Sequence, residues 1–153
     1  MQKTLMLPAL VTILAACGGG GGEAAPPAAA PAAAAEPQTV DEQIAVGQKL
    51  YGENCASCHG ASGEGSAKAP KVVGVAQGAL PLDPPPNAKF RKVQFKTAAD
   101  VGGWVAQNMP PGEGGSLKEW QYWAILAFDL KANGVTPAKK VDAASAKEIV
   151  LHP

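Results

Sequence analysis

The sequence has few metal-binding residues, no excess of either charge and no long apolar run. Its 153 residues contain 2 histidines and 3 cysteines, and 13 Lys and Arg are balanced by 13 Asp and Glu. With no basic stripe there is no electrostatic footprint for nucleic acid. No apolar run reaches the about 20 residues that a membrane-spanning helix needs, and no segment convincingly predicts a strand. We therefore expect an all-α chain that does not bind nucleic acid.

Three of the scarce residues stand together, in the run Cys55-Ala56-Ser57-Cys58-His59. The Cys-x-x-Cys-His spacing is the attachment signal for c-type haem. Two thiols three positions apart on one helical turn can form thioethers to the two vinyl groups of one porphyrin, and the adjacent imidazole can reach the iron. The run predicts one haem c per chain, held by Cys55 and Cys58, with His59 as an iron ligand.

Three other uses of these cysteines stay open from the residues alone. A thioredoxin-like redox pair has the same spacing but is expected near a βαβ pattern. A structural zinc site wants about four Cys or His ligands, and only Cys17 and His152 remain to complete one. A disulfide between Cys55 and Cys58 is the third alternative.

The front of the chain predicts export and a lipid anchor. Lys3 precedes an apolar run from Leu5 to Ala16, which is typical of a signal peptide covering residues 1–16. The run ends Leu-Ala-Ala-Cys and resembles a bacterial lipobox, so Cys17 is the expected lipid attachment site. An ordinary signal peptide that happens to contain a cysteine is the alternative. Both interpretations place the protein outside the cytoplasm, where bacterial c-type haem attachment is completed.

Residues 17–38 consist of that cysteine and a Gly/Ala/Pro-rich segment. Such a composition buries too few apolar side chains to fold and predicts a flexible linker. The linker would let a lipid-anchored domain reach partners near the membrane, or it is only a spacer. Gly18 stands where inner-membrane lipoproteins of this type carry an aspartate, which slightly favours the outer membrane. We expect the periplasmic side of a bacterial cell envelope.

Residues 39–134 are expected to form one small domain with three main helices. Each helix is preceded by a Ser or Thr with an acid three residues later, the pattern of a capping box. The pairs are Thr39 with Glu42, Thr97 with Asp100, and Ser116 with Glu119. The predicted helices are 40–54, 98–108 and 117–132. The last has an apolar stripe that is typical of a core-facing helix: Trp120, Trp123, Ala124, Ala127 and Leu130.

Two stretches have weaker signals. Residues 60–96 are rich in Gly, Pro and Lys and show no sustained period, so we expect a long loop that wraps around the haem. Residues 135–153 form a C-terminal tail with a short helix near 143–150, and its purpose is not assigned.

The second axial ligand of the iron is sought by elimination. Thioether and imidazole are the usual ligands in electron-transfer haems, and the mature chain offers Met109 and His152. Met109 precedes Pro110, which disfavours helix and places it in an extended loop able to lean over a ring face. His152 lies at a chain end that frays. Met109 is the preferred ligand. A role of Met109 as core filler is one alternative, and binding of the iron by His152 is another.

Over residues 39–134 the sequence resembles the class I cytochrome c family. The matching residues are Gly47 and Tyr51, the Cys55–His59 run, Met109 with Pro110, and the aromatic last helix with Trp120 and Trp123. The resemblance implies a small all-α domain of three main helices around a covalent haem, in which the first and last helices cross closely. It also implies that the Pro70 carbonyl orients His59, although Pro70-Lys71-Val72-Val73-Gly74 departs from the common Pro-x-Leu-x-Gly pattern.

These features predict an extracytoplasmic one-electron carrier rather than an enzyme. Iron held from both sides leaves no open position for oxygen or peroxide. The partners would be a protein electron donor and acceptor in or near the membrane, and the membrane surface itself through the lipid. Two alternatives stay open: a haem peroxidase or gas sensor with a labile sixth ligand, and a fixed cytochrome subunit of a membrane oxidoreductase complex.

Overall fold

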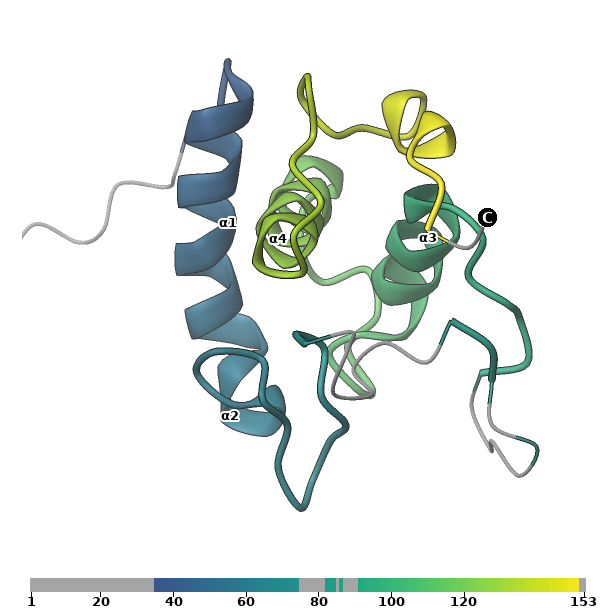
Figure 1. The fold of residues 1–153 in the computed structure, drawn as a ribbon. Coiled ribbons are helices and arrows are strands. Elements are labelled where there is room, and N and C mark those ends of the chain that lie inside the picture. Colours follow the sequence, from purple (N-terminus) through teal and green to yellow (C-terminus); the bar gives the residue numbers. More distant parts are fainter. Residues whose placement is uncertain (1–34, 75–81, 85, 87–90, 152–153) are drawn as a thin grey trace, which may run out of the picture. The chain divides into compact units, whose positions relative to one another are not determined.

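The computed structural model of the protein describes residues 35–74, 82–84, 86 and 91–151. Its elements are α1 (Val40–Asn54), α2 (Ala56–His59), α3 (Ala98–Asn108), α4 (Glu119–Ala132) and the 3-10 helix η2 (Ser145–Glu148) (Figure 1). These described ranges contain no strand, only an isolated bridge between Thr97 and Val150. The all-α prediction is confirmed. The predicted signal peptide, Cys17, most of the linker and His152 lie outside the described residues.

Two helices have the predicted bounds because their caps form as the sequence indicates. The Thr39 hydroxyl accepts the amide of Glu42 at 3.2 Å, and the Glu42 carboxylate accepts the amide of Thr39 at 3.1 Å. At the start of α3 the Asp100 carboxylate accepts the Thr97 amide at 2.8 Å. Each cap supplies partners for amides that have none within the helix.

The third predicted start is wrong. α4 begins at Glu119 rather than at residue 117, and the pair Ser116 and Glu119 does not form the box. Instead, the side-chain oxygen of Gln121 accepts the amide of Lys118 at 2.9 Å. The reciprocal acceptor thus lies two residues further along the chain than expected, and the helix begins at Glu119, directly after the cap residue Lys118.

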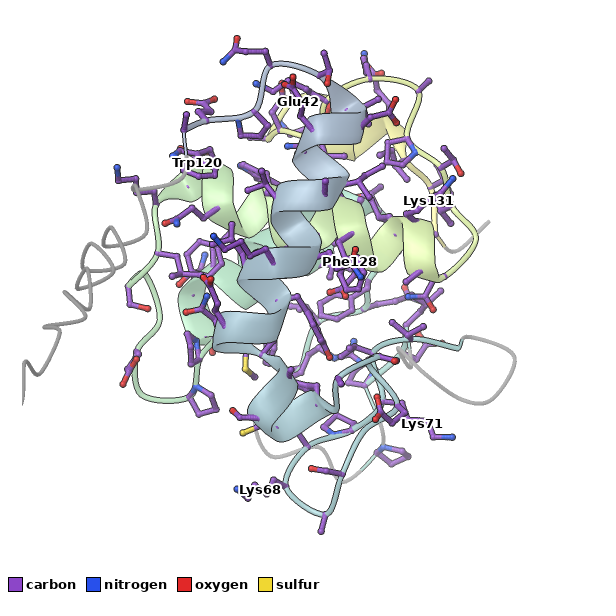
Figure 2. All side chains as sticks on the ribbon, turned by 90° about the vertical axis from the view of Figure 1, so that its left-hand side faces the viewer. Glu42, Lys68, Lys71, Trp120, Phe128 and Lys131 are labelled. Carbon is purple, nitrogen blue, oxygen red and sulfur yellow. The ribbon has the colours of Figure 1, made fainter. Side chains whose placement is uncertain are left out.

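α1 and α4 cross closely, and a glycine makes the approach feasible. A Cβ atom on Gly47 would collide with the backbone carbonyl of Ala124. Below the crossing, the rings of Tyr51 and Phe128 pack with centroids 5.3 Å apart. Figure 2 shows Phe128 on α4 behind α1. The close crossing implied by the resemblance is therefore present.

α3 packs on the other side of α4 and supplies a second cluster. Buried residues of this cluster include Phe95, Ala98, Val101, Leu126 and Leu130. Within α3, a Cβ on Gly102 would meet the ring of Trp123. The glycine that weakens this helix as a local sequence therefore allows an indole to pack against its backbone.

The tail folds back onto the same core. The short helix expected near 143–150 is the 3-10 helix Ser145–Glu148, which packs against α3 (Figure 1). The buried Gln43 side chain of α1 bonds both backbone groups of Val141, at 2.7 Å each. Val141 and Ala146 belong to the cluster of α3 and α4, so the described tail contributes to the hydrophobic core.

No helix within the described ranges has the length and apolar character needed to cross a membrane.

Candidate functional site

The cysteine pair lies at the junction of α1 and α2. Cys55 ends the first helix, where its amide bonds the carbonyl of Tyr51 at 2.8 Å, and it also precedes α2. The amides of Cys58 and His59 both bond the Cys55 carbonyl, at 3.1 and 2.9 Å. Both thiols are free and half-buried. One helical turn therefore holds two available sulfur atoms and an imidazole close together.

The imidazole of His59 is oriented by a backbone carbonyl. Its Nδ1 lies 2.8 Å from the carbonyl oxygen of Pro70. A nitrogen that donates to this acceptor carries the ring proton, so the lone pair remains on Nε2, where a metal would bind. The Pro70 segment is held near α2 by the amide of Gly65, which bonds the His59 carbonyl at 2.7 Å.

The electrostatics of Cys55 favour an attached sulfur over a redox nucleophile. Burial raises the pKa of this thiol to about 12, with smaller contributions from the charges of Asp129 and Cys58. A redox-active cysteine depends on a lowered pKa to expose its thiolate. A thioether carries no charge at any pH, so it suits a site that disfavours the thiolate.

The described residues give no support to the metal alternative. They contain no group of three or more His, Cys, Asp or Glu side chains that could hold a metal ion. The described ranges also lack the strands on which a thioredoxin-like pair would be mounted.

Met109 lies at the C-terminal end of α3. Its amide still bonds the carbonyl of Val105 at 2.8 Å, and its own φ and ψ of −122° and 143° are extended, as expected before Pro110. The hydroxyl of Tyr122 donates to the Met109 carbonyl at 3.0 Å. The methionine is half-buried and tied to α4 through its backbone.

α4 also holds the segment that follows Pro70. The side-chain amide of Asn133, just after the helix, donates to the Val72 carbonyl at 2.8 Å, and its oxygen accepts the Gly74 amide at 2.9 Å. Tyr122 near the start of α4 and Asn133 after its end therefore fix the Met109 segment and the Pro70 segment to one helix.

Sequence reasoning missed three residues of this arrangement. Tyr122 and Asn133 act through partners far along the chain, which no local pattern reveals; Asn133 was expected only as a helix stop. Asp129 could have been noticed, because it places a carboxylate next to the buried positions Ala127 and Leu130. Its Oδ1 is buried without a hydrogen-bond partner in the described structure.

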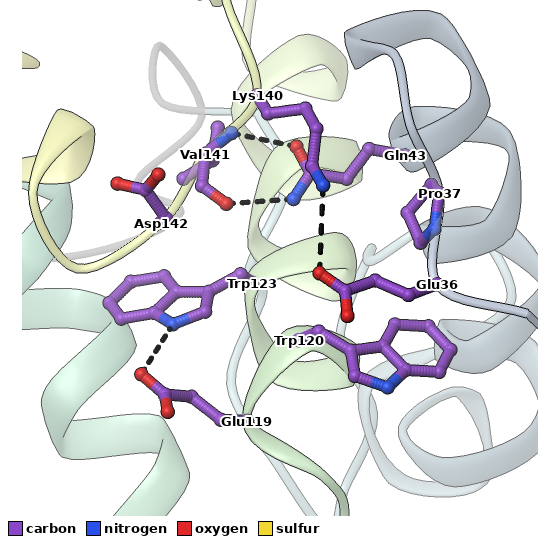
Figure 3. A pocket seen from close by; sticks show the side chains of 9 residues that line it. All are labelled: Glu36, Pro37, Gln43, Glu119, Trp120, Trp123, Lys140, Val141 and Asp142. Carbon is purple, nitrogen blue, oxygen red and sulfur yellow. Dashed lines mark hydrogen bonds and ion pairs between the residues drawn. The ribbon is translucent and has the colours of Figure 1, made fainter.

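A pocket of about 310 Å³ lies elsewhere, beside the start of α1 (Figure 3). Four of its lining side chains are paired: Lys140 pairs with Glu36 at 3.6 Å, and the Trp123 indole donates to Glu119 at 3.2 Å. α1 is about 22 Å long, and Cys55 stands at its other end. The pocket is where the tail joins α1 and α4, and it contains none of the predicted site residues.

The residues at the Cys55 end fit a covalently bound haem. They offer two free thiols on one turn and an imidazole with Nε2 available, and the predicted second ligand Met109 lies in an extended segment after α3. The unpartnered Oδ1 of Asp129 shows in addition that the described residues alone leave a buried polar group unsatisfied near Cys55.

Comparisons with known proteins indicate a c-type haem in this chain. A family model described as Cytochrome c matches residues 44–131. Thiosulfate dehydrogenase of Stutzerimonas stutzeri (strain A1501) is 30% identical over 91 residues, which cover 56% of this chain and 26% of that protein. The crystal structure of the sulfane dehydrogenase SoxCD from Paracoccus pantotrophus is similar at a TM-score of 0.53 and 29% identity, over 71% of this chain and 52% of that one. This chain therefore spans about a quarter and about half, respectively, of the two proteins.

Proposed function

The chain belongs to the cytochrome c family, and we propose that it is a one-electron carrier of the bacterial periplasm in which His59 and Met109 bind the haem iron from opposite sides. It is an electron-transfer protein with covalently bound haem c. The axial ligands, the envelope location and the lipid anchor at Cys17 belong to the proposal.

The haem iron, when bound, supplies a centre that changes its charge by one without a chemical step on a substrate. The chain's residues hold that centre in one environment. Cys55 and Cys58 prevent its loss, Pro70 fixes the ring of His59, and Tyr122 fixes the backbone of Met109. Little has to move between the two oxidation states.

The observation that carries the proposal is the attachment of Met109 to α4. A labile sixth ligand, as in a peroxidase or gas sensor, needs a segment that can withdraw. Here the Met109 carbonyl accepts a hydrogen bond from a Tyr122 hydroxyl that also accepts two amides of the same loop, from Gly115 at 3.1 Å and Leu117 at 3.4 Å. This network supports a fixed ligand and a closed site.

The ligand assignment is tested by the near-infrared methionine-to-iron charge-transfer band of the oxidised, haem-loaded protein. Wild type should show the band and bind cyanide slowly. Met109→Ala should lose the band, bind cyanide at once and have a lower reduction potential, because a thioether favours the reduced state. His152→Ala is the matched control and should behave as wild type. A wild-type protein without the band, or a band lost only in His152→Ala, would refute the proposal.

The anchor is tested separately. Cys17→Ser should release haem-loaded protein from the membrane fraction in a bacterial host, because two or more acyl chains are needed for stable attachment and all would be lost. Continued membrane retention would show that something other than lipid holds the chain.

A second function is favoured by the two similar proteins, which are named as a thiosulfate dehydrogenase and a sulfane dehydrogenase. The chain would then be a fixed electron-accepting subunit of an enzyme that oxidises reduced sulfur compounds. Purification under mild detergent distinguishes the two: a stable complex reduced by thiosulfate supports the subunit, whereas a free chain that thiosulfate alone does not reduce supports the carrier.

A further inference from the structure

Asp129 is a half-buried acid, and one of its two carboxylate oxygens is fully buried. Its Oδ1 is closed off from solvent and has no hydrogen-bond partner in the described part of the chain. Buried polar atoms in folded proteins nearly always have a partner, and an unpartnered one costs about 1–3 kcal/mol. A carboxyl group that serves only packing would be better replaced by an apolar side chain, so this one needs another explanation.

The position of Asp129 places it beside the haem attachment. On α4 it lies between Tyr122, which holds Met109, and Asn133, which holds the segment after Pro70. Its charge raises the pKa of the Cys55 thiol and also that of the Tyr51 hydroxyl. Asp129 therefore lies on the helix that supports both ligand segments and within electrostatic reach of Cys55, where the porphyrin is attached.

We propose that Asp129 is a redox-linked proton acceptor: its carboxylate takes up one proton from solvent when the iron receives an electron from a protein donor, and it releases that proton when the electron leaves. The inference rests on the proposed carrier function. In it, the protein carries one proton together with each electron.

The coupling follows from the charge at the iron. A ferric centre has one more positive charge than a ferrous one, and a nearby positive charge favours the carboxylate. Reduction removes that charge in a medium of low dielectric, so the pKa of Asp129 rises on reduction. Burial raises the pKa of Asp129 to about 8 in the chain itself, which puts its titration near neutral pH, where such a change alters its protonation.

Among the described residues, few other titratable side chains compete for this role. From α1 the neighbour is Tyr51, whose hydroxyl donates to the Gly60 carbonyl at 3.0 Å, and Cys55 has no proton to exchange once it is a thioether. In the 60–74 segment Glu64 acts on Tyr51 and is exposed. Asp100 is the titratable residue of α3 and is bonded in the helix cap. Lys131, on α4 itself, is exposed.

The test is the midpoint potential of haem-loaded protein, measured by spectroelectrochemistry from about pH 5 to about pH 9. In wild type the midpoint potential should fall as the pH rises through the range in which Asp129 titrates. The fall should be up to about 59 mV for each tenfold decrease in proton concentration, which is the value for a one-electron couple. Asp129→Asn should lack this slope and keep a potential close to that of wild type at low pH. Glu148→Gln is the control, because it removes an exposed acid on η2 that pairs with Lys139.

A second measurement does not depend on the variant's fold. The reduced-minus-oxidised infrared spectrum of wild type should gain the C=O band of a protonated carboxyl group, and this band should be absent from Asp129→Asn. An equal slope in wild type and Asp129→Asn, or no carboxyl band, would overturn the proton coupling while a reversible one-electron couple leaves the carrier function intact. A protein without a reversible couple would overturn both.

Discussion

The hydroxyl of Tyr122 donates a hydrogen bond to the Met109 carbonyl across 3.0 Å and accepts the amides of Gly115 and Leu117. A phenolic oxygen has one proton and two lone pairs, and all three are used. One side chain of α4 therefore closes the loop that begins at the predicted ligand.

Removing this hydroxyl should loosen the ligand. Tyr122→Phe leaves the Met109 carbonyl and the Leu117 amide without their partner, while the Gly115 amide keeps its bond to the Ala106 carbonyl. We expect the free energy of unfolding to fall by about 1–3 kcal/mol. In haem-loaded protein the methionine charge-transfer band should weaken and cyanide should bind faster. Tyr51→Phe is the matched control, because its hydroxyl bonds Gly60 on the His59 side. Equal cyanide rates in the two variants would contradict the role of Tyr122.

The α1–α4 crossing can be tested with two glycines of the same helix. Gly47→Ala would place a methyl group against the Ala124 carbonyl. It should destabilise the protein by about 1–3 kcal/mol or more, because two closely packed helices cannot move apart without losing other contacts. Gly52→Ala enters open space and should stabilise α1 by up to about 1 kcal/mol. Urea unfolding of both variants measures the difference. A Gly47→Ala protein as stable as Gly52→Ala would show that the helices do not approach this closely.

The docking of the tail depends on one glutamine. Gln43→Leu deprives both backbone groups of Val141 of their partner in a buried setting, at an expected cost of about 1–3 kcal/mol for each group. Amide hydrogen exchange in residues 135–151 should rise. Gln48→Leu changes an exposed glutamine on the same helix and should leave the exchange as it is. If the amides of residues 135–151 were equally protected from exchange in Gln43→Leu, docking of the tail would not depend on this glutamine.

The stability of the folded protein should respond to pH through Asp129. Its folded pKa of about 8 lies above the ordinary value of 3.8, so its contribution is most favourable below about pH 4 and is lost as the pH rises toward 8. Asp129→Asn should therefore gain stability relative to wild type between pH 4 and pH 8. The helix-cap acids Glu42 and Asp100, whose pKa values are lowered mainly by backbone hydrogen bonds, weaken both proteins equally below pH 4. Urea titrations at several pH values measure the difference, and a constant difference would contradict a buried ionisable group.

Local signals predicted the parts of the fold that depend on neighbours in sequence. The bounds of α1 and α3 follow from caps whose two members stand three residues apart, and the family resemblance correctly indicated the close approach at Gly47. The start of α4 was misplaced because Ser116 and Lys118 both precede an acceptor three residues away, and only the fold selects Gln121. Two candidates of similar local strength cannot be ranked without the packing around them.

The site was predictable where its residues are adjacent and not where they are distant. Cys55, Cys58 and His59 form one motif, whereas Asn133 meets Val72, and Tyr122 meets Met109, only after folding. The contact between His59 and Pro70 was suggested by family resemblance, and the structure places the two atoms 2.8 Å apart. The axial role of Met109 stays a prediction until the charge-transfer band is measured.

The passage of Gly47 against Ala124 has a consequence for the order of events during biosynthesis. A ribosome makes the chain from its N-terminus, so α1 and the two cysteines exist well before the helix that covers them. In the export that we propose, the chain crosses the membrane N-terminus first, so the two thiols would reach the compartment of haem attachment before α4. Attachment would then precede the closing of α4 against α1.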